Sequence, residues 1–190
     1  MFGTKHSPAA PPTSAMDAAA SPFAGTDADR YDPPEDFVPA HLPAPGPFLA
    51  GHDVLEGADH VEVHRLAAEC FETRGVYDVT FGYNLAQLNL DRGHPDAGFR
   101  YARDRDDPSV LRAEFTPTTP FCPQAYTLAA GAFRALNGEA DRHDFALVCV
   151  RVAPMHHASE GMNADLEALE DRFAETGSLA PPEGPAGVGG

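Results

Sequence analysis

The sequence predicts an α+β fold, an α/β sandwich in which helices pack on a small mixed sheet of about three to four strands. Three observations predict it. Residues 63–71 place apolar side chains at helical spacing, residues 77–85 alternate apolar and polar side chains, and residues 145–150 form an apolar run. The expected order is helix, strand, strand, helix, strand, helix. About 125 residues, from Asp53 to Thr176, suffice for one core.

The first helix is expected to be about 14 residues long. The segment Asp59-His-Val-Glu62 resembles a capping box, and Gly75 is a typical stop signal. A strand should follow over residues 77–85. The apolar phase flips near Ala86, which predicts a bulge or turn there. Residues 91–108 are polar and rich in Arg and Asp, so we expect an exposed insertion that can hold a short strand.

The second half of the chain alternates strands and helices. A strand is expected over Val110–Thr116, and a helix over Pro123–Leu136 that ends at Asn137-Gly138. The run Phe145–Val150 is apolar on both faces, which favours a central strand. Asn163 can cap a last helix that runs to about Thr176.

The flanks of the chain have a different composition. Residues 1–50 hold 10 of the 19 prolines and 11 alanines, and residues 177–190 hold 5 glycines and 3 prolines. Such segments bury too little apolar surface to offset the entropy of ordering. We therefore expect a disordered arm over 1–52, one domain over 53–176 and a disordered tail over 177–190.

The charge of the chain excludes some partners. It carries 29 acidic and 13 basic residues, a net charge of −16. This charge opposes nucleic-acid phosphates, so no nucleic acid is expected as a partner. Lys5 is the only lysine, and this bias fits either a halophilic cytoplasm or an acidic protein from a GC-rich genome.

No apolar run is long enough for a membrane helix, and the N-terminus lacks the hydrophobic region of an export signal. Three cysteines cannot all pair. A cytoplasmic protein with no membrane partner is expected.

Cys122 is the candidate reactive thiol. Within Thr118-Thr-Pro-Phe-Cys-Pro123 it stands at a predicted strand-to-helix turn, where Pro123 suits the first helical position. A sulfur at the helix N-cap would be stabilised as thiolate, the form that binds metal or attacks an electrophile. The alternative is a half-buried capping residue. Cys70 and Cys149 fall on apolar faces and are expected to be structural.

His156 and His157 form a second candidate group. They follow the apolar strand at its carboxyl end, where ligands often collect in open sheets, and at most one should reach a shared metal site. The alternative is that each is a solvated loop residue. Asp78 is either an edge charge or a supporting group. The remaining histidines are expected on the surface, among them His60, His64 and His143.

Three segments resemble the iron–sulfur cluster assembly domain family of SufT-like and PaaD-like maturation factors, a domain also fused to Mrp-type P-loop carriers. They are Gly75-Val-Tyr-Asp-Val79, Thr116-Pro-Thr-Thr-Pro-Phe-Cys-Pro123, and Val150-Arg-Val-Ala-Pro154 through Met162-Asn163. The resemblance covers about residues 59–172. It implies a small α/β domain that assembles or delivers Fe–S clusters, with Cys122 as a ligand and Thr118 and Thr119 in the same turn.

The expected function is therefore a non-enzymatic iron–sulfur maturation factor. Its partners would be client apo-proteins and other cluster-assembly factors. One chain offers one well-placed thiolate, so a transient cluster must be shared, for example by a homodimer, with His156, His157, a small thiol or a client's residues completing the set.

Two other functions stay open. The chain lacks the family's acidic segment before the first strand and carries the 91–108 insertion, which favours a non-catalytic adaptor that keeps the fold for protein contacts. Thiol enzyme chemistry with Cys122 and His156 is a third reading.

Overall fold

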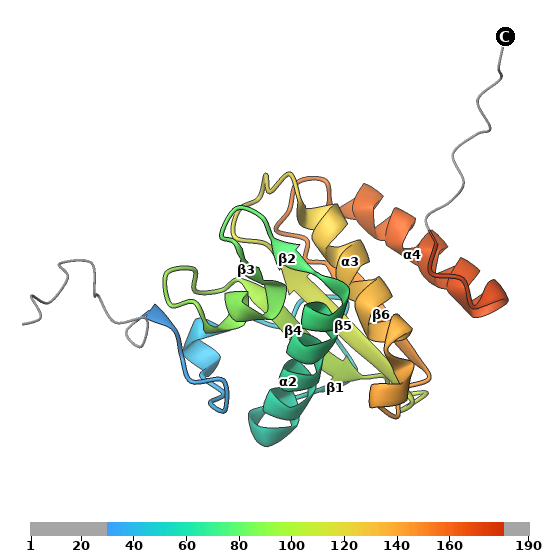
Figure 1. Cartoon of the computed structure of the whole chain (residues 1–190), viewed down its shortest axis with the longest axis horizontal. Helices are drawn as coiled ribbons and strands as arrows, with labels where there is room; N and C mark the ends of the chain where they lie inside the picture. The colour runs from blue at the N-terminus through green and yellow to red at the C-terminus, as the bar shows by residue number, and fades with distance from the viewer. Residues whose placement is uncertain (1–29, 181–190) are drawn as a thin grey trace, which may run out of the picture.

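A computed structural model describes residues 30–180 of the chain. Its main sheet has four strands in the order β1-β4-β5-β6 (Figure 1). They span Asp53–Val54 (β1), Gly98–Arg103 (β4), Val110–Thr116 (β5) and Leu147–Val152 (β6). The pairs β1/β4 and β4/β5 are antiparallel and β5/β6 is parallel, so the sheet is mixed. This confirms the predicted α+β class.

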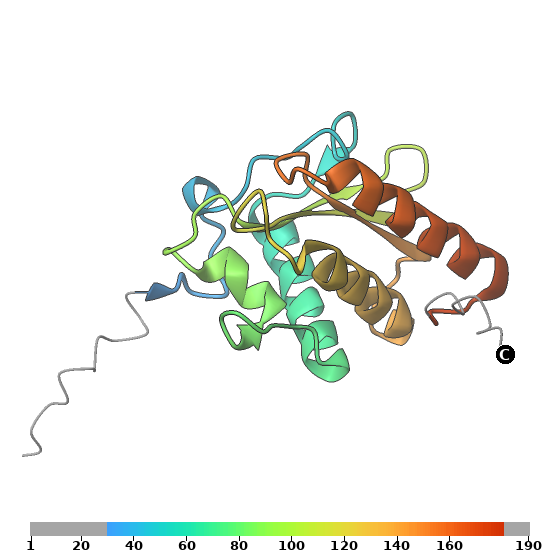
Figure 2. The same cartoon turned by 90° about the horizontal axis from the view of Figure 1, so that it is seen from above.

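Three long helices complete the fold: α2 (Gly57–Arg74), α3 (Ala125–Gly138) and α4 (Ser159–Thr176). Helices α2 and α3 cover one face of the sheet (Figure 2). That face presents Phe99 and Tyr101 from β4, Phe115 from β5 and Val150 from β6, all fully buried. Period-two alternation in the strands therefore meets the helical stripes of α2 and α3 in one core.

β6 lies at the edge of the sheet, which corrects the expectation of a central strand. Two asparagine side chains bond the backbone of this edge. The Asn137 amide bonds the N–H and C=O of Val148, and the Asn163 amide does the same for Val152, at 2.7–2.9 Å. An unpaired strand edge is thereby satisfied without a fifth strand.

The prediction of a disordered arm over 1–52 is wrong for residues 30–52, and residues 1–29 lie outside the described part. Residues 42–50, here called the strap, lie on the sheet face opposite α2 and α3 (Figure 2). Leu49 is fully buried and Leu42 is 7% exposed. Tertiary burial orders this proline-rich segment although it has no local period.

Residues 30–41 lead into the strap and are also held by the domain. Arg30 pairs with Asp91 at 3.0 Å and Arg92 pairs with Asp32 at 2.6 Å, around an isolated β-bridge between Tyr31 and Asp91. Both carboxylates are buried while both arginines are partly exposed. The folded unit therefore begins well before Asp53.

The prediction that residues 91–108 are an exposed insertion is wrong over residues 98–103, although the short strand expected within the segment is present there. These residues form β4, an inner strand between β1 and β5, and five of its six residues are buried. Arg100 is only 5% exposed. The sequence pattern indicated an exposed segment because the second face of this strand carries an arginine, Arg100, which is in fact buried.

The predicted single strand over 77–85 is not present. The segment consists of the short strands β2 (Tyr77–Asp78) and β3 (Tyr83–Asn84), which pair as a hairpin, followed by the 3-10 helix η2 (Leu85–Leu90). The phase change near Ala86 marks this helix rather than a bulge. The alternation over 77–85 predicted one longer strand, but a turn at Gly82, where φ is +73°, divides the segment.

The observed helix boundaries agree with the predicted ones better than the observed capping residues do. α2 ends at the predicted Gly75, which has the left-handed φ of +68°, but begins after Glu56 rather than at a capping box of Asp59. α4 begins at Ser159, and Asn163 lies inside it. Residues 177–180 of the predicted tail are described, and Leu179 packs against the core. Residues 181–190 lie outside the described part.

Candidate functional site

The candidate site is one end of the molecule, where α3 and α4 begin (Figure 1, top). Three segments meet there: the β2–β3 hairpin (77–83), the β5–α3 loop (117–124) and the β6–α4 loop (153–158). These segments are here called the loop end. They include every residue that the sequence singled out as a ligand.

Side-chain and backbone hydrogen bonds join the three segments. The Gln124 side-chain amide donates to the Thr80 hydroxyl at 2.7 Å, which ties the hairpin to the β5–α3 loop. The backbone N–H of His157 donates to the Pro120 carbonyl at 3.0 Å, which ties that loop to the β6–α4 loop. The loop end is therefore one connected surface.

His156 is a structural residue of this surface. It is 2% exposed, and both ring nitrogens are bonded. Nε2 donates to the Cys122 carbonyl at 3.1 Å, and Nδ1 accepts from the Ala158 N–H at 3.2 Å. A carbonyl can only accept and an amide N–H can only donate, so the tautomer is fixed. Neither nitrogen is free to hold a metal.

His157 is exposed and serves mainly to orient a neighbour. Its Nδ1 donates to the Pro120 carbonyl at 2.7 Å, which leaves Nε2 for other partners. Its ring lies 5.0 Å from the ring of Phe121. The structure thus places His156 and His157 beside the loop that carries Cys122, but the two histidines contact backbone carbonyls and an aromatic ring.

Cys122 does not occupy the helix N-cap. The N-cap of α3 is Gln124, two residues further on, and the Cys122 side chain packs partly against the core. The expected N-cap position is therefore wrong: Pro123 and Gln124 continue the turn before the helix begins. Within residues 30–180, no three His, Cys, Asp or Glu side chains are grouped so that they could hold a metal ion.

The other predicted groups have local roles. Thr118 is half-buried and Thr119 is exposed, and the Thr119 carbonyl accepts from the Cys122 N–H at 3.3 Å. Asp78 is 4% exposed and accepts hydrogen bonds from the backbone N–H of Thr80 and Phe81. It shapes the hairpin turn rather than supporting a ligand.

The loop end is apolar and nearly uncharged. Of its residues only Asp78 is charged, and that side chain is buried. Four large hydrophobic side chains remain exposed within residues 30–180, and all four belong to the loop end. They are Tyr77 at 37%, Val79 at 78%, Phe121 at 71% and Met155 at 41%.

Two histidines expected on the surface are buried. His60 is 3% and His64 is 6% exposed, and their rings stack 5.7 Å apart on α2. Burial lowers the pKa of His60 to about 3 and that of His64 to about 4. His64 bonds the Tyr101 hydroxyl and the Ala86 carbonyl, while His60 Nδ1 has no hydrogen-bond partner within residues 30–180. Their i, i+4 spacing, which places both histidines on one face of the helix, was the sequence signal that could have indicated their shared burial.

The fold and the loop end define a small α+β domain. A family model described as a domain of unknown function, DUF7998, matches residues 29–180. The chain belongs to this family. No curated protein and no solved structure matches the chain. The match begins at residue 29, so the strap is part of the family's domain. Within residues 30–180, no helix is both long and apolar enough to span a membrane.

Proposed function

We propose that this domain is a non-catalytic adaptor that binds a partner protein through the loop end. The observation that carries the proposal is the position of the exposed apolar side chains. In a chain with a net charge of −16, the four large ones of the described part all lie on this one uncharged surface. Grouped exposed apolar residues are typical of protein interaction sites.

The surface also has the rigidity that an anchor residue needs. Phe121 is 71% exposed, yet its ring packs on His157, which is itself bonded to the loop that carries Phe121. His156 holds the same two loops together from beneath. An aromatic side chain that is already ordered loses little entropy on binding, so it can contribute strongly to affinity.

Site-specific photo-crosslinking in the cells that make the protein tests the proposal. A benzophenone amino acid at position 121 or 155 is expected to give one product of defined mass, identified by mass spectrometry. The same probe at exposed Ala58, at the other end of α2, is the matched control. A product of twice the chain mass identifies a second copy as the partner. Equal products from positions 121 and 58, or none from 121 and 155, contradict the proposal.

Iron–sulfur maturation is a second candidate because Cys122 lies in this same surface. It is half-buried, whereas Cys70 and Cys149 are buried, so it is the thiol that a client could reach. A cluster carried there would be cargo held by Cys122 together with ligands from a client, another assembly factor or a second copy. Client docking through the loop end would serve both functions.

Anaerobic reconstitution with iron and sulfide separates the two candidates. A cluster factor should gain visible absorbance and bound sulfide, both lost in Cys122→Ala and retained in Cys149→Ala. If the Cys122→Ala spectrum equals that of the parent chain, this second function is excluded. Photo-crosslinking at position 121 would then still report on the adaptor function alone.

A further inference from the structure

The sheet face under the strap is built for one particular peptide sequence. The Glu114 carboxylate, 1% exposed, accepts hydrogen bonds from the backbone N–H of Gly46 at 2.6 Å and of Phe48 at 3.2 Å. A Cβ at Gly46 would collide with the Glu114 carboxylate, so any other residue at this position of the strap requires the buried Glu114 side chain to shift.

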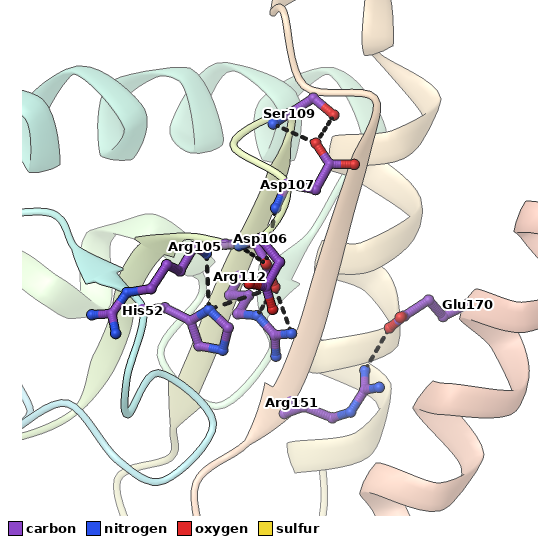
Figure 3. Close-up of polar contacts among 9 residues, drawn as sticks. His52, Arg105, Asp106, Asp107, Ser109, Arg112, Arg151 and Glu170 are labelled. Carbon is purple, nitrogen blue, oxygen red and sulfur yellow. Dashed lines mark hydrogen bonds and ion pairs between the residues drawn. The ribbon is translucent and has the colours of Figure 1, made fainter.

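Arginines supply the remaining contacts. The guanidinium groups of Arg112 and Arg151 lie 4.9 and 5.1 Å from the centre of the Phe48 ring. Arg100 donates to the Pro43 carbonyl at 3.1 Å. Figure 3 shows Arg112 and Arg151 on neighbouring strands, with Arg151 reaching Glu170 on α4 at 2.7 Å. The face thus contacts a glycine, an aromatic ring and the backbone of a turn, in which the Leu49 N–H donates to the Gly46 carbonyl at 3.1 Å.

The same face contains the partners that Glu114 would need without the strap. In the sheet register, Glu114 lies opposite Arg100 on one side and opposite Arg151 on the other. Within residues 30–180, it nevertheless forms no ion pair with either. Its oxygens are bonded instead to the strap, and burial raises its pKa. When the strap leaves, a row of Arg, Glu and Arg side chains can neutralise itself.

The link between the strap and β1 can act as a hinge. Gly51 is exposed with φ of +84°, and a Cβ there would meet nothing within 4 Å. The bond from the His52 N–H to the Leu49 carbonyl is that of a local turn. The ion pairs that hold residues 30–41 have partly exposed arginines.

We propose that the face beneath the strap is a recognition groove for a Gly-Pro-aromatic-Leu turn, which the strap of a second copy can fill in exchange for the chain's own. A second copy is the occupant because it carries this sequence and offers every contact already seen. The groove lies on the sheet face, away from Phe121, so this inference does not depend on the loop end.

A peptide of residues 42–50, fluorescently labelled, tests the groove by anisotropy with full-length protein. The variants Phe48→Ala and Gly46→Ala weaken the chain's own strap. Each should bind the peptide at least about tenfold more tightly than the parent chain. A control peptide with alanine in place of its glycine should not bind, because its Cβ would meet Glu114. Two variants are used so that a loss of folding in one leaves the other as a test, and circular dichroism reports their folding.

The outcomes divide clearly. If both variants fold and neither binds the peptide, or if the control peptide binds equally, the groove is excluded. If both variants unfold, the strap is a fixed part of the fold and exchange is excluded as well.

Deleting Gly51 shortens the hinge and should give a concentration-dependent dimer in light scattering. A Gly51-deleted chain that stays monomeric while the variants bind peptide overturns the second copy as occupant.

Discussion

The loop end and the face beneath the strap reverse the usual distribution of side chains. At the loop end, large apolar side chains such as Val79 and Phe121 are exposed on an uncharged surface. Beneath the strap, Arg100 and Glu114 are buried at 5% and 1% exposure. Exposed apolar groups gain from a partner, whereas buried charges require fixed bonds. The first surface therefore favours binding of another protein, and the second favours recognition of one defined segment.

Acid should give the largest effect on stability, and it should act on the α2 side of the sheet, opposite the strap. His60 and His64 have pKa values lowered to about 3 and about 4, and Phe37, which precedes the strap, packs 5.0 Å from His60. The unfolded chain binds protons below about pH 6.5 while the folded chain does not, so stability falls as pH falls through this window. Between pH 6.5 and 4.5 we expect a loss of roughly 3–5 kcal/mol in the free energy of unfolding.

Urea unfolding at a series of pH values measures this loss. Glu114 acts in the opposite sense, because a carboxyl whose pKa is raised by burial takes up its proton earlier in the folded chain. His60→Leu should remove about half of the pH dependence. An unchanged slope in that variant would show that the acid sensitivity originates elsewhere.

Truncation of one apolar side chain in each region should give the next largest difference. Leu49 in the strap is fully buried, so Leu49→Ala should lower the free energy of unfolding by about 2–5 kcal/mol. Phe121→Ala at the loop end removes a larger but exposed side chain and should change it by less than about 0.5 kcal/mol. Denaturant midpoints measure both. Equal losses in the two variants would contradict the contrast between the regions.

The sequence predicted those elements in which the apolar positions of the pattern are the positions that pack in the core. α2, β5 and α3 lie close to the expected ranges because one face of each is apolar and enters one core. The order of the strap and the burial of β4 were missed for related reasons. Arg100 of β4 is buried and bonds the Pro43 carbonyl of the strap, and Gly46 of the strap bonds Glu114 of β5, so neither segment has an apolar pattern of its own.

The candidate site was predicted in position but not in chemistry. Cys122, His156 and His157 do meet at one end of the sheet, because strand ends and helix starts converge there. Their roles depend on single backbone bonds and on a two-residue shift of the helix start. Neither is encoded in the spacing of residue types along the chain.

His156 should contribute to stability rather than to metal binding. His156→Ala removes two hydrogen bonds from a buried loop pair and leaves the Cys122 carbonyl with fewer donors, so we expect a loss of about 1–3 kcal/mol. His157→Ala is the matched control at an exposed position and should cost less. Thermal and urea unfolding provide the comparison. A stable His156→Ala chain would show that the loops are held by other contacts.

The smallest expected effect on stability, and the most selective on reactivity, concerns the three thiols. Burial raises the pKa of Cys70 to about 11 and also raises that of Cys149, which lies on the strap side of the sheet. Cys122 at the loop end is half-buried. A thiol reagent applied to the folded chain should therefore label one cysteine rapidly, and Cys122→Ser should abolish that phase while Cys149→Ser preserves it. Rapid labelling of Cys149 instead would mean that the strap opens often enough to expose the groove, which would link the two regions through the exchange proposed above.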